Sequence, residues 1–147
     1  MTELRIHRVL PAPPDRVWRA LTDPAALAAW FWPQARYGTV AETDPRPGGK
    51  YRIDAPKAGI GTAGEYIAVE PPHRLVMTWR WAGEPTETLV TIELEEAPDG
   101  TALTLIHERF DTDKSRDDHA QGWNDCLDRL PQWLDADAAT GPGTTEA

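Results

Sequence analysis

Residues 115–134 read SRDDHAQGWNDCLDRLPQWL. Apolar residues recur in this stretch in alternating steps of three and four, at Ala120, Trp123, Leu127, Leu130 and Leu134. Because an α-helix has about 3.6 residues per turn, these residues form one apolar stripe, which predicts a long amphipathic helix packed on another apolar surface. Ser115 and Asp118 resemble a capping box at its start. Pro131 lies within the stripe, where a proline removes a backbone hydrogen bond, so we expect a kink or a break there.

The surface on which this helix packs is indicated by short runs of alternating apolar and polar residues. Leu75, Met77, Trp79 and Trp81 lie at every second position, and later segments alternate in the same way. This period of two is typical of antiparallel strands that have one side in water. We expect strands over residues 3–10, 51–54, 66–70, 75–81, 90–95 and 103–107.

Two short helices are expected between the first strand and the rest of the sheet. Pro13 and Pro14 suit the first turn of a helix, and apolar residues then follow at helical spacing within residues 12–22. The Asp23-Pro24 pair ends that helix and begins a second one over residues 25–30.

The stretch Gly59–Gly64 matches the G-x-G-x-x-G pattern of dinucleotide-binding loops. In such a loop the glycines follow a strand and open a helix, whose N-terminus binds the pyrophosphate. Here residues 65–69 read as a strand, so we interpret the glycines as a hairpin loop and expect no nucleotide cofactor.

Composition excludes several classes of function. The chain has 147 residues, a formal net charge of −9 and a single cysteine. Because nucleic acids and anionic lipids bind mainly to Lys and Arg, we expect neither partner. We also expect no metal site, no cofactor and no disulfide. The N-terminal segment MTELRIHRVL is charged and lacks the apolar core of a secretion signal, so we expect a cytoplasmic protein.

Short motifs in a fixed order run from residue 3 to residue 134. They are VLPAPPDRVWRALTDP at 9–24, Leu27, Trp30, Pro47-Gly48-Gly49, Gly64-Glu65, Glu70-Pro71-Pro72, Leu75, Thr78-Trp79, Gly100-Thr101, Leu103, Gly122-Trp123, Leu127 and Leu130. In these motifs the chain resembles the START-like SRPBCC superfamily. Within it, the chain is most similar to the group related to the C-terminal domain of the activator of the heat-shock-protein-90 ATPase.

The resemblance implies an α+β helix-grip fold of the START-like or Bet v 1-like type. A curved antiparallel sheet of about seven strands would wrap around the C-terminal helix, with two short helices after the first strand and a cavity between sheet and helix. We expect this single domain over residues 1–135, and a mobile acidic tail over 136–147. Members of the superfamily bind hydrophobic small molecules, act as polyketide cyclases or serve as co-chaperones.

The aromatic residues are the strongest sign of a site, since the chain has seven Trp against two Phe. Large rings that converge on one interior are hard to pack without gaps, and ligand pockets are mostly apolar and aromatic. We expect the cavity to be lined by six aromatic residues and to receive polar contacts from two histidines. They are Trp30, Trp32, Tyr51, Trp79, Trp81 and Trp123, with His107 and His119. The alternatives are a filled core and hydrogen-bonded core histidines.

Three functions follow from this pattern. The first is the binding of a small, largely apolar or aromatic molecule in the cavity. The second is a co-chaperone-like or regulatory role in which the acidic surface contacts a protein partner. The third is catalysis of the cyclase or dehydratase type in the same cavity, with His107 or His119 as the base. Cys126 is interpreted as a small buried filler rather than a nucleophile.

Overall fold

The computed structural model of the protein describes residues 2–31 and 38–140. Its strands are β1 (Thr2–Leu10), β2 (Val40–Thr43), β3 (Lys50–Ala55), β4 (Ile60–Glu70), β5 (Arg74–Trp81), β6 (Thr88–Ala97) and β7 (Gly100–Phe110). Its helices are α1 (Pro14–Thr22), α2 (Pro24–Trp30), the short 3-10 helix η2 (Pro56–Ala58) and α3 (Asp113–Thr140).

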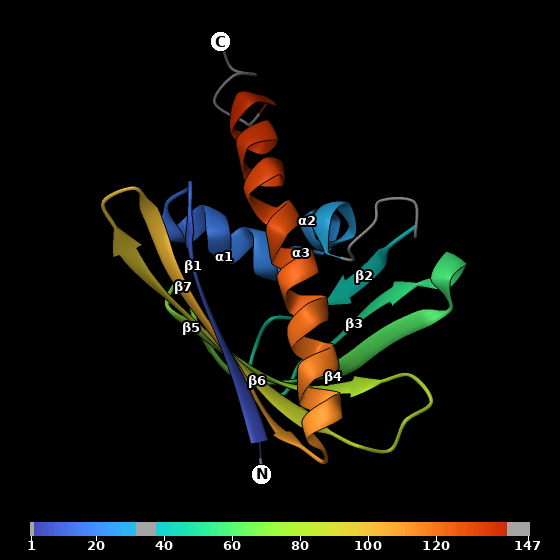
Figure 1. The fold of residues 1–147 in the computed structure, drawn as a ribbon. Coiled ribbons are helices and arrows are strands. Elements are labelled where there is room, and N and C mark those ends of the chain that lie inside the picture. The colour runs from blue at the N-terminus through green and yellow to red at the C-terminus, as the bar shows by residue number, and fades with distance from the viewer. Residues whose placement is uncertain (1, 32–37, 141–147) are drawn as a thin grey trace.

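The seven strands form one antiparallel sheet in the order β1-β7-β6-β5-β4-β3-β2. The sheet curves, and α3 lies along its concave side, with α1 and α2 packed near the C-terminal half of α3 (Figure 1). The α+β helix-grip fold expected from the sequence is therefore confirmed.

Alternation along the strands determines which side chains face α3. In β7, Leu103, Leu105 and His107 are buried while the residues between them are partly exposed. In β5, Leu75, Met77 and Trp79 are buried, and Val76 between the first two is buried as well. Because side chains alternate between the two sides of a strand, these residues form a continuous apolar surface under the helix.

The two short helices are separated where the sequence indicated. Asp23 follows α1, and its carboxylate accepts a hydrogen bond of 2.9 Å from the backbone N–H of Ala26. Pro24 then occupies the first turn of α2, where a proline has no hydrogen bond to lose. These two residues turn the chain, so that α1 and α2 both pack into the core.

The long helix differs from its prediction at both ends. It begins at Asp113, and the side chain of Thr112, rather than Ser115, caps it by accepting the Ser115 N–H at 3.0 Å. It continues through Pro131 to Thr140, so of the two outcomes expected at the proline, a kink or a break, the break is wrong. Contacts with α1 hold the extension: Arg16 donates to the Leu134 carbonyl at 2.8 Å and also pairs with Asp137. Residues 141–147 of the expected tail lie outside the described residues.

The glycine-rich stretch also differs from its prediction. Only Gly59 lies in a turn, with a positive φ of 69°, and Ile60–Gly64 belong to β4. Gly64 is required for close packing of the strands, because a Cβ there would come within 2.0 Å of the Thr78 carbonyl oxygen. No helix follows these glycines, as expected.

Within residues 2–31 and 38–140, none of the helices is long and apolar enough to span a membrane. The same part of the chain contains no group of three His, Cys, Asp or Glu side chains that could bind a metal ion.

Candidate ligand site

A cavity of about 560 Å³ lies between the sheet and the N-terminal half of α3. Four aromatic side chains form much of its wall: Phe31 after α2, Trp79 and Trp81 of β5, and Trp123 of α3. The other lining residues are Ile60, Glu84, Thr112, Lys114, Ser115, Asp118, His119, Gly122 and Cys126. The apolar residues therefore come from elements far apart in sequence, and the polar ones cluster around the start of α3.

The aromatic wall is a consequence of two sequence patterns that meet. Alternation along β5 directs Trp79 and Trp81 toward α3, and the apolar stripe of α3 directs Trp123 toward the sheet. The ring centroids of Trp79 and Trp123 are 5.0 Å apart, and those of Trp79 and Trp81 are 5.8 Å apart in an edge-to-face arrangement. Phe31 meets Trp123 edge to face at 5.7 Å. Tilted rings of this kind leave wedge-shaped space that aliphatic side chains would fill.

Gly122 provides part of the space on the side of the helix. It lies within α3, where glycine is less stable than alanine by about 1 kcal/mol, and it lines the cavity. A Cβ atom at this position would have nothing within 4 Å. The residue therefore faces open space, and a larger side chain would project into the cavity.

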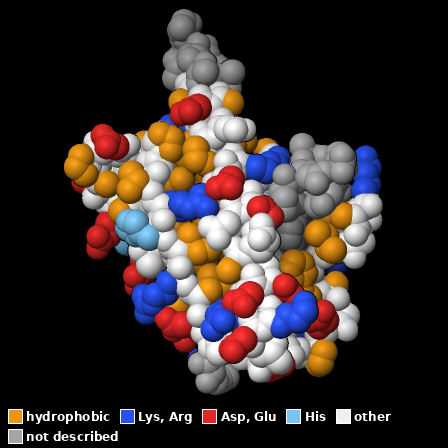
Figure 2. Space-filling view, in the orientation of Figure 1, with side chains coloured by type: hydrophobic (Ala, Val, Ile, Leu, Met, Phe, Trp, Pro, Cys, Tyr) orange, Lys and Arg blue, Asp and Glu red, His pale blue; other side chains and the backbone are white. Residues whose placement is uncertain are grey.

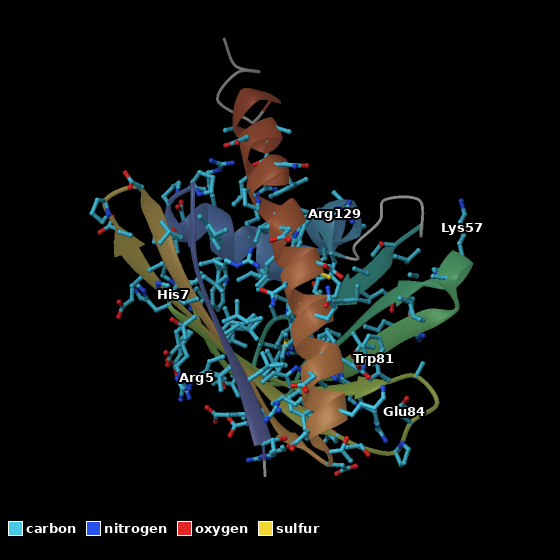
Figure 3. All side chains as sticks on the ribbon, viewed as in Figure 1. Arg5, His7, Lys57, Trp81, Glu84 and Arg129 are labelled. Carbon is cyan, nitrogen blue, oxygen red and sulfur yellow. The ribbon has the colours of Figure 1, made fainter. Side chains whose placement is uncertain are left out.

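His119 lies in the cavity wall and is held by two hydrogen bonds. Its Nε2 accepts the indole N–H of Trp81 at 2.6 Å, and its Nδ1 lies 2.7 Å from the Ser115 carbonyl. Because an acceptor nitrogen carries no proton, this geometry assigns the neutral tautomer with the proton on Nδ1. The two hydrogen bonds therefore fix the orientation of the His119 ring, and the bond to Trp81 also fixes the orientation of the Trp81 indole. Figure 3 shows Trp81 and Glu84 on the same side of α3, toward its N-terminal end.

His107 lies behind the aromatic wall and has no exposed surface. Its Nδ1 accepts the Trp123 indole N–H at 3.0 Å, and its Nε2 is 2.6 Å from the Thr88 hydroxyl. That hydroxyl is itself placed to donate to the Trp79 carbonyl at 3.1 Å, so Nε2 carries the proton. Burial, and secondarily the neighbouring His119, lowers the pKa of His107 to about 2. His107 is accordingly a neutral core residue with both nitrogens occupied, which was one of the alternatives from the sequence.

A bulge in β7 places Phe110 beside both histidines. The pairing of β1 with β7 changes register between Thr2 and Glu3. Arg109 is the extra residue of β7 at this point, and it has a positive φ of 76°. The extra residue lets both His107 and Phe110 face the core. The Phe110 ring then lies 4.5 Å from that of His107 and 4.9 Å from that of His119. The strained backbone at Arg109 therefore lets Phe110 pack against His107 and His119.

The eight predicted site residues divide into groups. Trp79, Trp81, His119 and Trp123 line the cavity. Trp30 is fully buried beside it, with its indole N–H donated to the Ala20 carbonyl at 2.8 Å. Tyr51 is also buried, and its hydroxyl donates to the Thr78 carbonyl at 2.5 Å. His107 is described above, and Trp32 lies outside the described residues.

Other lining residues were not identified from the sequence. The sequence groups Trp30, Phe31 and Trp32 together but does not show which ring turns inward. Cys126 follows Trp123 by three residues, so the spacing of the helix could have placed it on the same face. Burial raises the pKa of its thiol to about 12, which keeps the sulfur protonated and unreactive at neutral pH.

Charged and polar side chains surround the mouth of the cavity. Lys114 and Asp118 are exposed and form an ion pair of 2.8 Å one turn apart on α3. Acidic and basic side chains alternate over this end of the molecule (Figure 2). The mouth therefore has no strong preference for ligands of one charge.

Residues 11–135 match the family model described as Activator of Hsp90 ATPase homolog 1-like protein. The chain belongs to this family. Protein CV1439 from Chromobacterium violaceum is 34% identical, with a TM-score of 0.75 over 90% of this chain and 96% of its own. No protein of curated function matches this chain.

Two further solved structures resemble this member of the family. CalU16 from Micromonospora echinospora is 28% identical, with a TM-score of 0.73 over 98% of this chain and 79% of its own. DynU16, described as a protein in the dynemicin biosynthetic locus, is 28% identical with a TM-score of 0.78. That similarity covers 90% of this chain and 47% of DynU16.

Proposed function

We propose that the protein binds a small, largely apolar or aromatic molecule in the cavity between the sheet and α3. The observation that carries the proposal is the combination of about 560 Å³ of space with a wall of four aromatic rings. Small-molecule sites typically occupy roughly 300–1,000 Å³ and combine an apolar lining with a few polar groups. The location of DynU16 in a biosynthetic locus is consistent with a small-molecule ligand.

Binding would be driven mainly by removal of apolar surface from water. Trp79, Trp123 and Phe31 offer ring faces and edges at different angles, which suits a planar ligand wedged among them. Charged groups of such a ligand would stay near Thr112, Ser115 and His119, the polar lining residues around the start of α3. The aromatic rings of the ligand would pack against the aromatic wall.

The other two functions expected from the sequence receive less support. His107 is unavailable as a base because it has no exposed surface and both its nitrogens are bonded. The free nitrogen lone pair of His119 is taken by Trp81. For a protein partner, the mixed charges in Figure 2 offer no acidic patch on that side of the molecule.

Filling the cavity from the helix tests the proposal. Gly122→Leu would place a side chain in the open space, while Gly122→Ala adds only a methyl group and serves as the matched control. We expect a panel of two- and three-ring aromatic compounds, titrated against Trp fluorescence, to include ligands of the parent protein. Their affinity should fall at least tenfold in Gly122→Leu and stay within about twofold in Gly122→Ala.

Melting temperatures distinguish a variant with a blocked cavity from one that is misfolded. Both substitutions replace a helical glycine, so their melting temperatures should equal or exceed that of the parent. The proposed function would be refuted if no compound of the panel bound the parent protein. It would also be refuted if a folded Gly122→Leu variant bound the ligands with unchanged affinity.

A further inference from the structure

One buried N–H group in a residue of the cavity wall has no hydrogen-bond acceptor among the described residues. Trp79 is only 3% exposed, and its indole N–H is buried without a hydrogen-bond acceptor in the part of the chain that the structure describes. Buried indole N–H groups normally find an acceptor, because an unmade hydrogen bond in a dry interior costs free energy. The other buried wall indole, Trp123, follows this rule through His107.

The rings around Trp79 cannot supply the acceptor. Trp81 and Trp123 carry N–H groups that only donate, and both are already bonded to histidines. His107, whose ring centroid is 5.5 Å from that of Trp79, has both nitrogens occupied. The side chain of Phe31 has no polar atom. The Trp79 ring lines the cavity, but its N–H has almost no accessible surface, so an acceptor from outside the protein reaches it only where a ligand shifts the neighbouring rings.

We propose that Trp79 selects the ligand by donating its indole N–H to a neutral oxygen at the buried end of the molecule. This inference rests on the proposed function and specifies its ligand class: aromatic compounds that carry a carbonyl oxygen, in preference to hydrocarbons of the same shape. A carboxylate fits less well, since an ion in this apolar interior would need a buried cation. Lys114 is the one cation among the described lining residues, and it is paired with Asp118 at the mouth.

A matched pair of compounds isolates the oxygen. Fluorenone and fluorene share a rigid three-ring skeleton and differ only by C=O in place of CH₂. We expect the parent protein to bind fluorenone about tenfold more tightly, which corresponds to one hydrogen bond to a buried donor. Titration followed by Trp fluorescence or calorimetry gives both affinities.

Removing the donor should abolish the preference. Trp79→Phe keeps an aromatic ring but has no N–H, so fluorene should bind at least as well as fluorenone, whose carbonyl must then lose its water without compensation. Trp133→Phe is the control, because Trp133 lies on α3 beside Arg19 of α1 and outside the residues that line the cavity, so its loss should leave the preference intact. If Trp79→Phe does not fold, benzothienylalanine at the same position removes the N–H and preserves the shape of the indole.

A second readout follows the hydrogen bond itself. In a ¹⁵N-labelled sample, the Trp79 indole proton should shift downfield with fluorenone and not with fluorene. Binding of neither compound, nor of any other aromatic in the panel, would refute the proposed function. Equal binding of the two by the parent, or a fluorenone preference that survives in Trp79→Phe, would refute this inference and leave the proposed function standing.

Discussion

The two halves of α3 pack on the sheet in different ways. Toward the C-terminus, Leu127, Leu130 and Leu134 are almost completely buried in the hydrophobic core. Toward the N-terminus, the helix presents His119, Gly122 and Trp123 to aromatic rings and leaves a cavity. Aliphatic side chains interdigitate at many angles, whereas rings beside a glycine leave gaps. One helix thus anchors the fold at one end and forms a site at the other.

The largest effect on stability is expected from a substitution in the C-terminal half of α3. Leu130→Ala should lower the free energy of unfolding by about 2–5 kcal/mol, because Leu130 has no exposed surface and its truncation leaves a void in a tightly packed region. Urea denaturation followed by circular dichroism measures the change. Gly122→Ala, in the hollow half, should leave stability unchanged or raise it by up to about 1 kcal/mol. A loss below 1 kcal/mol in Leu130→Ala would contradict the description of this half as filled.

The buried histidine at the cavity end predicts a sensitivity to acid. The pKa of His107 is about 2 in the folded protein and near 6.5 in the unfolded chain, so only the unfolded chain binds a proton between these values. His107 therefore favours folding fully above pH 6.5, and its contribution falls by about 1.4 kcal/mol per pH unit as the pH drops toward 2.

Substitution by a group that does not titrate isolates this effect. His107→Gln should be less stable than the parent at pH 7, but its stability should decline less steeply between pH 6 and 4, by about 1.4 kcal/mol per unit. His7→Gln, at an exposed position on β1, should keep the steep decline of the parent. Identical slopes for His107→Gln and the parent would show that His107 is protonated in the fold. Denaturation curves collected at each pH give the slopes.

The smallest expected effect concerns the attachment of the helix end. Asp137→Asn weakens the ion pairs with Arg16 and Arg19, which are partly shielded from water, and should cost about 1 kcal/mol. Asp117→Asn removes the exposed pair with Arg116 and should cost less than about 0.5 kcal/mol. Thermal unfolding measures both. Neither variant should alter ligand affinity, and a change in Asp137→Asn would mean that the two halves of α3 are coupled.

Much of this architecture could be predicted because it depends on local spacing. The alternation in β5 was enough to place Trp79 and Trp81 on the side of the sheet that faces the helix, and the stripe in α3 placed Trp123 opposite them. Asp23 and Pro24 marked the break between the short helices for equally local reasons, a cap and a proline. The extension of α3 past Leu134 was missed, since it depends on Arg16 and Arg19 of α1.

The histidines show where local spacing stops being informative. His107 lies on an inward-facing strand position and His119 at the edge of the helix stripe, so both were candidates for the cavity. Their different locations depend on the bulge at Arg109, on Thr88 and on two indoles from distant elements. A residue with a positive φ that is not glycine carries no sequence signal of its own.

The sequence by itself determined the periodicities, and with them a long helix packed on an antiparallel sheet and the inward direction of the indoles, because side-chain direction follows from the backbone period of each element. The helix-grip arrangement was implied by the resemblance of its motifs to a known family. Only the tertiary structure decided that a cavity exists, that Gly122 and Phe31 border it, and that the N–H of Trp79 has no acceptor among the described residues. A cavity is the volume left between elements after they pack. It therefore depends on the distances and tilts of residues that no local pattern relates.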